Sequence, residues 1–228
     1  MKQALFIILI FAFSCKGQNN NEETTPDLPP SRAQTVTKGA TSAPPKLENP
    51  VTPDSSTFDG MATGLEGTEQ RPWIGAANPL ATVYVFSDYQ CPYCSRANNS
   101  FRSFIRAHSS KIRLVHVHLP LAFHKYAANF AKFAICAGKK GKFWLVNDYI
   151  YDNARTSLKA EDIAKYAGLD TYEFSNCVKS SETEEHLKKD LNYASSFGIR
   201  GTPTFRYNGK NYYLTTIITE LKSQLQIK

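Results

Sequence analysis

The sequence contains no apolar run long enough to cross a membrane as a helix. Its N-terminal run, residues 4–13, has about ten residues, whereas a membrane-spanning helix needs about 20. The 228 residues contain no internal repeat and no motif typical of nucleic-acid-binding proteins. With 42% hydrophobic residues, the chain is expected to form one soluble domain with additional segments, and no nucleic-acid partner is expected.

Cysteine is scarce, and among the five cysteines there is one closely spaced pair. Cys91 and Cys94 are two residues apart, whereas Cys15, Cys136 and Cys177 are isolated in the sequence. A structural zinc site needs four ligands and often uses a second closely spaced pair. Because the sequence lacks that second pair, we expect no metal ion and no cofactor; a metal site that recruits histidines is the minor alternative.

The N-terminal residues are typical of a bacterial export signal. Lys2 supplies a positive charge, residues 4–13 supply the apolar region, and Cys15 follows after one small residue. This ending is similar to a lipobox, although Ala12 occupies a position where leucine is usual. We therefore predict a signal peptide at residues 1–14 and a lipid anchor on Cys15. The alternative is an ordinary cleaved signal peptide.

Residues 15–69 have the composition of a tether. They are rich in Pro, Thr, Ser and Asn and poor in large apolar residues, so they cannot bury enough surface to offset chain entropy. A pro-segment is the alternative. Residues 16–69 carry 4 basic and 8 acidic residues, and residues 70–228 carry 22 basic and 12 acidic residues. The basic domain suits acidic partners or anionic lipid, but we favour a solvated basic face.

From residue 70 the pattern predicts a folded α/β domain. Residues 81–86 and 112–119 are rich in β-branched and aromatic residues and predict two strands. The helix predicted between them, residues 92–108, makes a right-handed parallel βαβ unit. Further helices are predicted near residues 127–138, 142–153, 158–167 and 182–196, and the C-terminal part is predicted as strands 204–207 and 212–215 and a helix at 216–226.

The sequence Cys91-Pro92-Tyr93-Cys94 stands where the first of these strands ends and the helix begins. A thiolate at a helix N-terminus is stabilised by the N–H groups that point out of the helix. Cys94 is about one helical turn further on, close enough to form a disulfide with Cys91. The pattern therefore predicts a reversible dithiol/disulfide pair.

The other cysteines leave room for a second disulfide. If Cys15 is lipidated, four cysteines remain, and four cysteines allow three disulfide pairings. The local pair Cys91–Cys94 would leave Cys136 with Cys177. Two buried free thiols are the alternative at these positions.

A third motif lies far from the cysteine pair. Thr202-Pro203 stands just before the strand predicted at residues 204–207 and is a good candidate for a cis peptide bond. The segments FSDYQCPYC, LPLAFHKYAANFAKFAICAGKKGKFW and GIRGTPTF, in this order, resemble the DsbA-like thiol–disulfide oxidoreductases of the bacterial envelope. The resemblance covers about residues 70–228. It implies a thioredoxin fold, a central mixed β-sheet flanked by helices, with a helical insertion at about residues 124–197 before the cis-proline loop.

The resemblance also implies roles for the cysteine motif. Cys91 would be the exposed nucleophile and Cys94 the buried resolving thiol, while Pro92 and Tyr93 would tune the reduction potential. Cys-Pro-Tyr-Cys is also similar to the motif of glutaredoxins and of a periplasmic isomerase. The insertion and export signal disfavour a glutaredoxin. A tether in place of a folded dimerisation domain favours a monomeric oxidase.

Roles are implied outside the cysteine motif as well. Pro203 would face the disulfide, and the Thr202 backbone would pair with substrate as an added strand. Asp88 would either move a proton to or from Cys94 or cap the turn into the helix, and we favour the cap. His124 matches a histidine of the family and is expected to be a packed residue at a helix start.

His116 and His118 alternate with valines and therefore share one face of the second strand. We expect a partly exposed face there, with metal binding as the alternative.

The sequence thus predicts an exported, lipid-tethered thiol–disulfide oxidase of the cell envelope or periplasm. Its expected partners are reduced or unfolded exported proteins, a quinone-linked membrane protein that re-oxidises it, and the membrane itself through the anchor. One alternative is a reductase or isomerase of the same fold. Another, from a different class, is a non-catalytic lipoprotein with a structural or metal-binding C-x-x-C pair.

Overall fold

The computed structural model describes residues 57–228. The predicted signal peptide, Cys15 with its lipid, and residues 16–56 of the predicted tether lie outside the described residues. The strands are β1 (Thr57–Phe58), β2 (Met61–Glu66), β3 (Arg71–Gly75), β4 (Ala81–Ser87), β5 (Ile112–His118), β6 (Thr204–Tyr207) and β7 (Lys210–Tyr212). The helices are α1 (Pro92–Ala107), α2 (Ala127–Gly138), α3 (Phe143–Asn153), α4 (Ala160–Ala167), α5 (Thr171–Lys179), α6 (Ser181–Ser196) and α7 (Leu214–Leu225).

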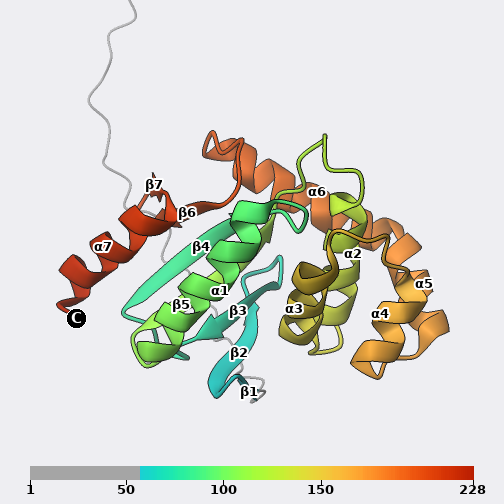
Figure 1. The fold of residues 1–228 in the computed structure, drawn as a ribbon, viewed down its shortest axis with the longest axis horizontal. Coiled ribbons are helices and arrows are strands. Elements are labelled where there is room, and N and C mark those ends of the chain that lie inside the picture. Colours follow the sequence, from blue (N-terminus) through green and yellow to red (C-terminus); the bar gives the residue numbers. More distant parts are fainter. Residues whose placement is uncertain (1–56) are drawn as a thin grey trace, which may run out of the picture. The chain divides into compact units, whose positions relative to one another are not determined.

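The strands form one mixed sheet in the order β1-β2-β3-β5-β4-β6-β7 (Figure 1). β4 and β5 are parallel and are joined through α1, which confirms the predicted βαβ unit. The other neighbouring strands are antiparallel. Because parallel neighbours end at the same edge, the segments that follow β4 and β5 meet there.

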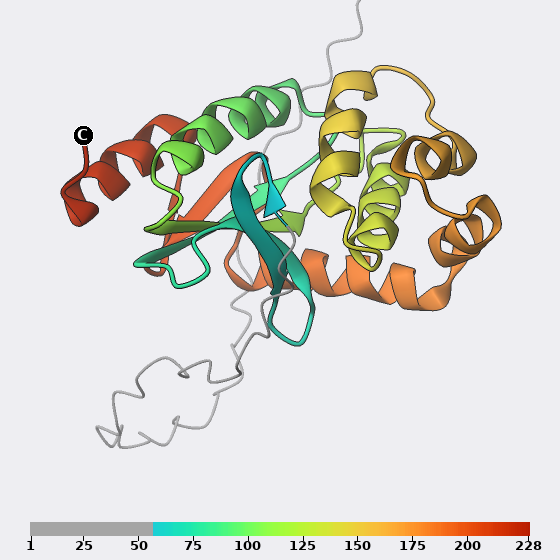
Figure 2. The same ribbon diagram turned by 90° about the horizontal axis from the view of Figure 1, so that it is seen from below.

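Helices cover both faces of this sheet. Figure 2 shows α1 and α7 on one face and α6 on the other. Phe101 and Ile105 of α1 are fully buried against the sheet with Val83 and Ile112. Burying a side chain of this size contributes about 1.5–3 kcal/mol, so α1 is held firmly along its length and its N-terminus has a fixed position.

The predicted tether boundary at residue 69 was wrong. Residues 57–66 form β1 and β2, and β2 pairs with β3, which the sequence pattern also missed. Gly64 of β2 lies under the Trp73 ring, where an added Cβ would come within 2.7 Å of the indole. Met61 of β2 and Trp73 of β3 are each 1% exposed, so both strands contribute to the core.

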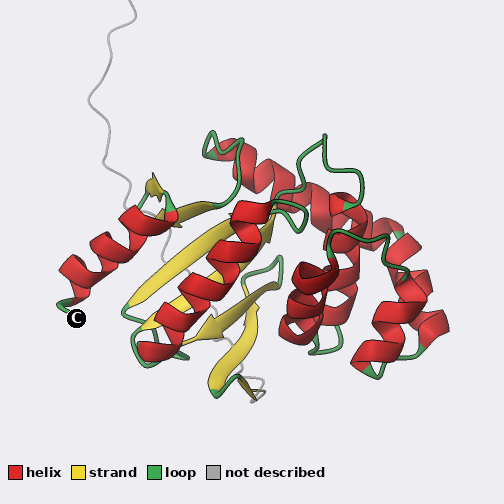
Figure 3. Cartoon of the chain, in the orientation of Figure 1, coloured by secondary structure: helices red, strands yellow, loops and turns green. Residues whose placement is uncertain are grey.

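The insertion between β5 and β6 is entirely helical apart from its connections, α2 to α6 (Figure 3). Residues 171–179 form α5, which the sequence pattern did not predict as a helix. Asp170 caps this helix, since its side chain accepts a hydrogen bond from the Glu173 N–H at 2.7 Å. At the C-terminus the return strand is Lys210–Tyr212 rather than residues 212–215, because Tyr213 already precedes the first turn of α7.

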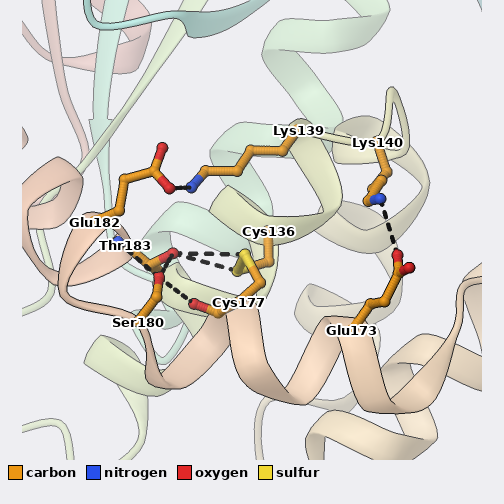
Figure 4. Close-up of a disulfide and its surroundings, with 8 residues drawn as sticks. All are labelled: Cys136, Lys139, Lys140, Glu173, Cys177, Ser180, Glu182 and Thr183. Carbon is orange, nitrogen blue, oxygen red and sulfur yellow. Dashed lines mark hydrogen bonds and ion pairs between the residues drawn. A yellow bond between two sulfur atoms is a disulfide. The ribbon is translucent and has the colours of Figure 1, made fainter.

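A disulfide joins two helices of the insertion. Cys136 of α2 is bonded to Cys177 of α5 (Figure 4), so the pairing predicted for these two residues is present. The Thr183 hydroxyl lies 3.5 Å from each sulfur. Among the described residues, no helix is both long and apolar enough to span a membrane.

Candidate active site

Cys91 and Cys94 lie at the sheet edge where β4 gives way to α1. Cys91 is the N-cap residue of α1 and Pro92 begins the helix, where its missing N–H costs nothing. The N–H of Cys91 donates to the Asp88 carbonyl at 3.2 Å, and that of Cys94 donates to the Cys91 carbonyl at 3.0 Å. Both cysteines are free thiols in the structure. They are therefore held at the helix start that the sequence predicted.

The environment shifts the pKa values of the two thiols in opposite directions. The hydrogen bond from the Cys94 thiol, helped by the N–H groups of Cys94 and Tyr93, lowers the pKa of Cys91 to about 5. Burial raises the pKa of Cys94 well above its usual range, and the hydrogen bond to Cys91 adds to this. The first turn of α1 contains no acidic residue to oppose the thiolate. At neutral pH the pair therefore carries one thiolate, on Cys91.

The cis-proline loop covers Cys91. The Thr202–Pro203 peptide bond is cis, and the Cys91 thiol lies 3.5 Å from the Thr202 carbonyl oxygen, 111 residues further along the chain. Cys91 was expected to be exposed, but the residue is only 5% exposed, because this loop packs against it. The two motifs that the sequence singled out thus meet at one point.

Asp88 fastens the turn before Cys91 to the loop after β5. Its carboxylate is buried and accepts hydrogen bonds from the N–H of Gln90 at 2.7 Å and of Leu121 at 2.6 Å. It also lies 2.9 Å from Nδ1 of His124. Its described contact with Cys94 runs through the backbone N–H, at 3.5 Å from Sγ. This geometry favours the structural role of Asp88 over proton transfer. The Asp88 side chain caps the turn that leads into α1 and does not cap α1 itself.

Gln90 is a site residue that the sequence gave no reason to single out. Its Oε1 accepts a hydrogen bond from the Tyr126 N–H at 2.5 Å, and its Nε2 donates to the Ala154 carbonyl at 3.4 Å. Gln90, the residue before Cys91, is therefore hydrogen-bonded to two loops of the insertion. Nothing in its local pattern distinguishes it from a solvent-exposed glutamine.

An aromatic cluster lies behind the cysteine pair. Ser87 at the end of β4 shares a 2.6 Å hydrogen bond with the hydroxyl of Tyr151, and the Tyr151 ring packs 4.8 Å from that of Tyr89. Tyr89 in turn lies 5.9 Å from His116. These tyrosines were not predicted as site residues, because the contacts join residues 27 to 64 positions apart.

The partly exposed face predicted for His116 and His118 was wrong. They are 2% and 1% exposed, because Phe143 and Tyr89 pack over this face of β5. Burial lowers the pKa of His116 to about 3 and that of His118 well below its usual value, so both rings are neutral. Among residues 57–228, no group of three or more His, Cys, Asp or Glu side chains is placed to hold a metal ion.

The arrangement suits thiol–disulfide exchange. Cys91 combines thiolate character with a position at a helix N-terminus, the two properties that make a thiol nucleophilic and a good leaving group. Cys94 is a protonated thiol hydrogen-bonded to it, close enough to close a disulfide.

Comparison with known proteins identifies the family. Residues 67–226 match the Thioredoxin family. A thioredoxin-like oxidoreductase from Silicibacter pomeroyi DSS-3 superposes with a TM-score of 0.59 at 23% identity, over 71% of this chain and 95% of that one. DsbA2 of Pseudomonas aeruginosa gives 0.54 at 24% identity (67% and 92%), and BdbD of Bacillus subtilis, in its oxidised form, gives 0.61 at 17% identity (73% and 98%).

Curated relatives with similar sequences are named as Na(+)/H(+) antiporters. A Na(+)/H(+) antiporter NhaA 3 of Salinispora tropica is 28% identical over 190 residues, and NhaA 1 of Salinispora arenicola is 29% identical over 190 residues. Each match covers 82% of this chain, which spans about a quarter of the relative's length (26%). Those whole proteins are named as antiporters. The match to the family, the sheet with its helical insertion, and the meeting of the C-x-x-C pair with the cis-proline loop together show that this chain belongs to the thioredoxin family and has a DsbA-like thiol–disulfide oxidoreductase fold.

Proposed function

We propose that this protein is an exported thiol–disulfide oxidase that forms disulfide bonds in other exported proteins through Cys91 and Cys94. The observation that carries the proposal is the opposite shift of the two thiols: the pKa of Cys91 is lowered to about 5, while that of Cys94 is raised. Stabilising the Cys91 thiolate stabilises the reduced pair. A pair that is stable when reduced is a strong oxidant when it is a disulfide.

The reaction transfers two electrons from substrate to enzyme. A substrate thiolate attacks Sγ of Cys91 in the Cys91–Cys94 disulfide, that bond breaks, and Cys94 leaves and takes up a proton. A second substrate thiolate then attacks the substrate sulfur of the mixed disulfide, and Cys91 leaves as a thiolate. The substrate gains a disulfide, and the enzyme holds the dithiol form in which both cysteines are free.

Location and partners follow from the same proposal. Disulfides persist in exported and envelope proteins, and the predicted signal peptide with lipid attachment at Cys15 would place the domain there on a tether. The substrates are reduced or unfolded exported proteins. The reduced enzyme needs an oxidant to complete its cycle, and a quinone-linked membrane protein is the proposed source. The domain acts as a monomer.

Redox titration of the full chain in glutathione buffers tests the direction of the chemistry. An oxidase should have a potential nearer DsbA, about −120 mV, than thioredoxin, about −270 mV. Its reduced form should melt at a higher temperature than its oxidised form. A potential near −270 mV would assign the protein to the reductase alternative.

Turnover of a dithiol peptide separates the enzyme from the non-catalytic alternative. Wild type should oxidise the peptide, whereas Cys91→Ser should not. Cys94→Ser should accumulate a mixed disulfide with a reactant disulfide, because no resolving thiol remains. A Cys91 pKa near the unperturbed value of about 8.5, together with absent turnover, would contradict an enzymatic role.

A further inference from the structure

Four exposed cationic side chains stand on four separate segments that reach the cysteine motif. They are Arg96 in α1, Lys125 in the loop before α2, Arg155 in the loop after α3 and Arg200 in the cis-proline loop. The proposed exchange reaction uses none of them.

Contacts on the described residues place two of these cations beside the C-x-x-C motif. The Arg96 guanidinium stacks on the ring of Tyr93, 4.7 Å from its centroid, and Tyr93 stands between the two cysteines. Arg200 is two residues before Thr202, whose carbonyl oxygen lies 3.5 Å from the Cys91 sulfur. Arg96 therefore lies beside the motif on the helix, and Arg200 stands on the cis-proline loop that covers Cys91.

Hydrogen bonds of Gln90 hold the two loops that carry the other two cations. Lys125 precedes Tyr126, whose N–H donates to Gln90, and Arg155 follows Ala154, whose carbonyl accepts from Gln90. Because Gln90 is bonded to Cys91 in the chain, both loops are held next to the cysteine motif. The four cations thus stand on α1, on the cis-proline loop and on two loops that Gln90 holds next to the cysteine motif. We call these four residues the basic ring.

No carboxylate in the described part of the chain pairs with any residue of the basic ring. In contrast, lysines on α2 and the turn that follows it are paired with glutamates of α5 and α6. These pairs are Lys132–Glu184, Lys139–Glu182 and Lys140–Glu173, at 2.5, 3.0 and 3.1 Å. Asp88 is buried and bound to His124, and Asp152, three residues before Arg155, is an exposed acid. The four cations of the basic ring are therefore free of ion pairs with the described carboxylates.

We propose that the basic ring selects acidic polypeptide segments, so that the preferred substrates carry Asp or Glu on both sides of the cysteine to be oxidised. This deepens the proposed oxidase function and rests on it. Charges of opposite sign steer encounter and raise the association rate by about 10- to 1000-fold when uncompensated. The effect is screened over about 10 Å at 0.1 M salt, so charges beyond a few residues from the cysteine contribute little.

The shape of the site favours a polypeptide over a membrane surface as the anionic partner. Cys91 is only 5% exposed, and the ring cations stand on separate segments. An extended chain can enter such a recess more readily than a flat membrane surface can. Exposed aromatic side chains on the same face, Tyr93 at 65% and Phe123 at 79%, offer apolar contact to such a chain. Phe123 packs edge-on against His124, which Asp88 holds at the site.

The test compares three peptides that differ only in the residues flanking one cysteine: Glu, Ser or Lys. The rate constant for reaction with the oxidised full-length protein should be at least about 10-fold higher for the Glu peptide than for the Lys peptide at low salt. At 1 M salt, where the screening length is about 3 Å, the two rates should converge. In the variant Arg96→Gln/Lys125→Gln/Arg155→Gln/Arg200→Gln the ratio should fall to about 1.

A matched variant controls for net charge. Lys165, Lys179, Lys222 and Lys228 are exposed and lie on α4, α5 and the C-terminal segment. Changing all four to Gln removes the same charge and should leave the Glu-to-Lys ratio as in wild type. A ratio near 1 in wild type, or an equal loss in both variants, would overturn the proposal.

A binding measurement keeps this proposal separate from the oxidase function. Peptides with Ser in place of the central Cys cannot react, yet the Glu version should bind wild type more tightly than the Lys version by fluorescence anisotropy. If that preference holds while the neutral peptide is never oxidised, the oxidase function fails and the charge preference stands. If the basic-ring variant loses binding to phosphatidylserine vesicles but keeps its peptide preference, the ring serves a membrane surface and the proposal is wrong.

Discussion

The carboxylate of Asp88 lies 2.9 Å from Nδ1 of His124, 36 residues further along the chain. This contact joins the segment that ends β4 to the segment that follows β5. With the hydrogen bonds to Gln90 and Leu121, it makes Asp88 the link between the cysteine turn and the loop that carries Phe123 and Lys125. The site therefore depends on a side chain that does not itself touch the reactive sulfur.

Asp88→Asn should loosen this link. An amide accepts hydrogen bonds only through its oxygen. Its NH2 group would therefore face at least one of the N–H donors that now bind the carboxylate. We expect a loss of unfolding free energy of about 1–3 kcal/mol, measured by denaturant unfolding, with the alkylation pKa of Cys91 unchanged. Asp152→Asn, which alters an exposed acid, should have little effect. Unchanged stability together with slower release from the mixed disulfide would instead assign Asp88 to proton transfer.

The low pKa of Cys91 predicts how the stability of the reduced protein depends on pH. Folding lowers this pKa from about 8.5 in an unfolded chain to about 5. The resulting stabilisation is fully present above about pH 8.5, and it decreases as the pH falls and is lost below about pH 5. The oxidised protein lacks this thiol. The difference in melting temperature between the reduced and oxidised forms should therefore grow from pH 4 to pH 8.

Cys94 variants test the cause of that shift. The hydrogen bond from the Cys94 thiol is the largest contribution that lowers the pKa of Cys91. Cys94→Ala removes the donor, so the midpoint of Cys91 alkylation against pH should move upward. Cys94→Ser keeps a donor at the same position, so its midpoint should stay closer to wild type. Equal midpoints in the two variants would show that the helix N-terminus alone sets the pKa.

The disulfide of the insertion should contribute to stability but not to the exchange chemistry. Cys136 and Cys177 are 41 residues apart in the sequence, and the loop-entropy relation gives about 4 kcal/mol for a loop of this length. The double variant Cys136→Ser/Cys177→Ser should lose about this much by denaturant unfolding, while the potential of the Cys91–Cys94 pair stays as in wild type. A changed potential would show that the insertion is coupled to the cysteine site.

His116 should make the protein sensitive to acid. Burial lowers its pKa to about 3, compared with about 6.5 when unfolded. The neutral ring is tolerated above pH 6.5, and stability is lost progressively as the pH falls below this value, because the unfolded chain takes up the proton first. His116→Phe keeps an aromatic ring beside Tyr89 and Phe143, so it should stabilise the protein more at pH 5 than at pH 8, measured by urea unfolding at both values.

The sequence predicted the parts of the fold whose signals are local. The β4–α1–β5 unit has strong strand and helix patterns, and Pro92 begins the helix where a missing N–H is harmless. The β2 and β3 strands were missed, because they are short and their large buried side chains, Met61, Trp73 and Ile74, stand among Gly, Thr, Pro and charged residues. The burial of His116 was also missed, because its cover is supplied by α3, which starts 27 residues later.

By itself, the sequence determined the reactive pair and its place at a helix start, because a two-residue spacing and a preceding strand are local properties of the chain. It also determined the basic composition of the domain. Only the tertiary structure decided that the Thr202 carbonyl lies against Cys91, that Gln90 and Asp88 hold two loops beside it, and that the segments carrying the basic ring reach the cysteine motif. These contacts join residues 33 to 111 positions apart, and they exist only once the sheet edge brings those segments together.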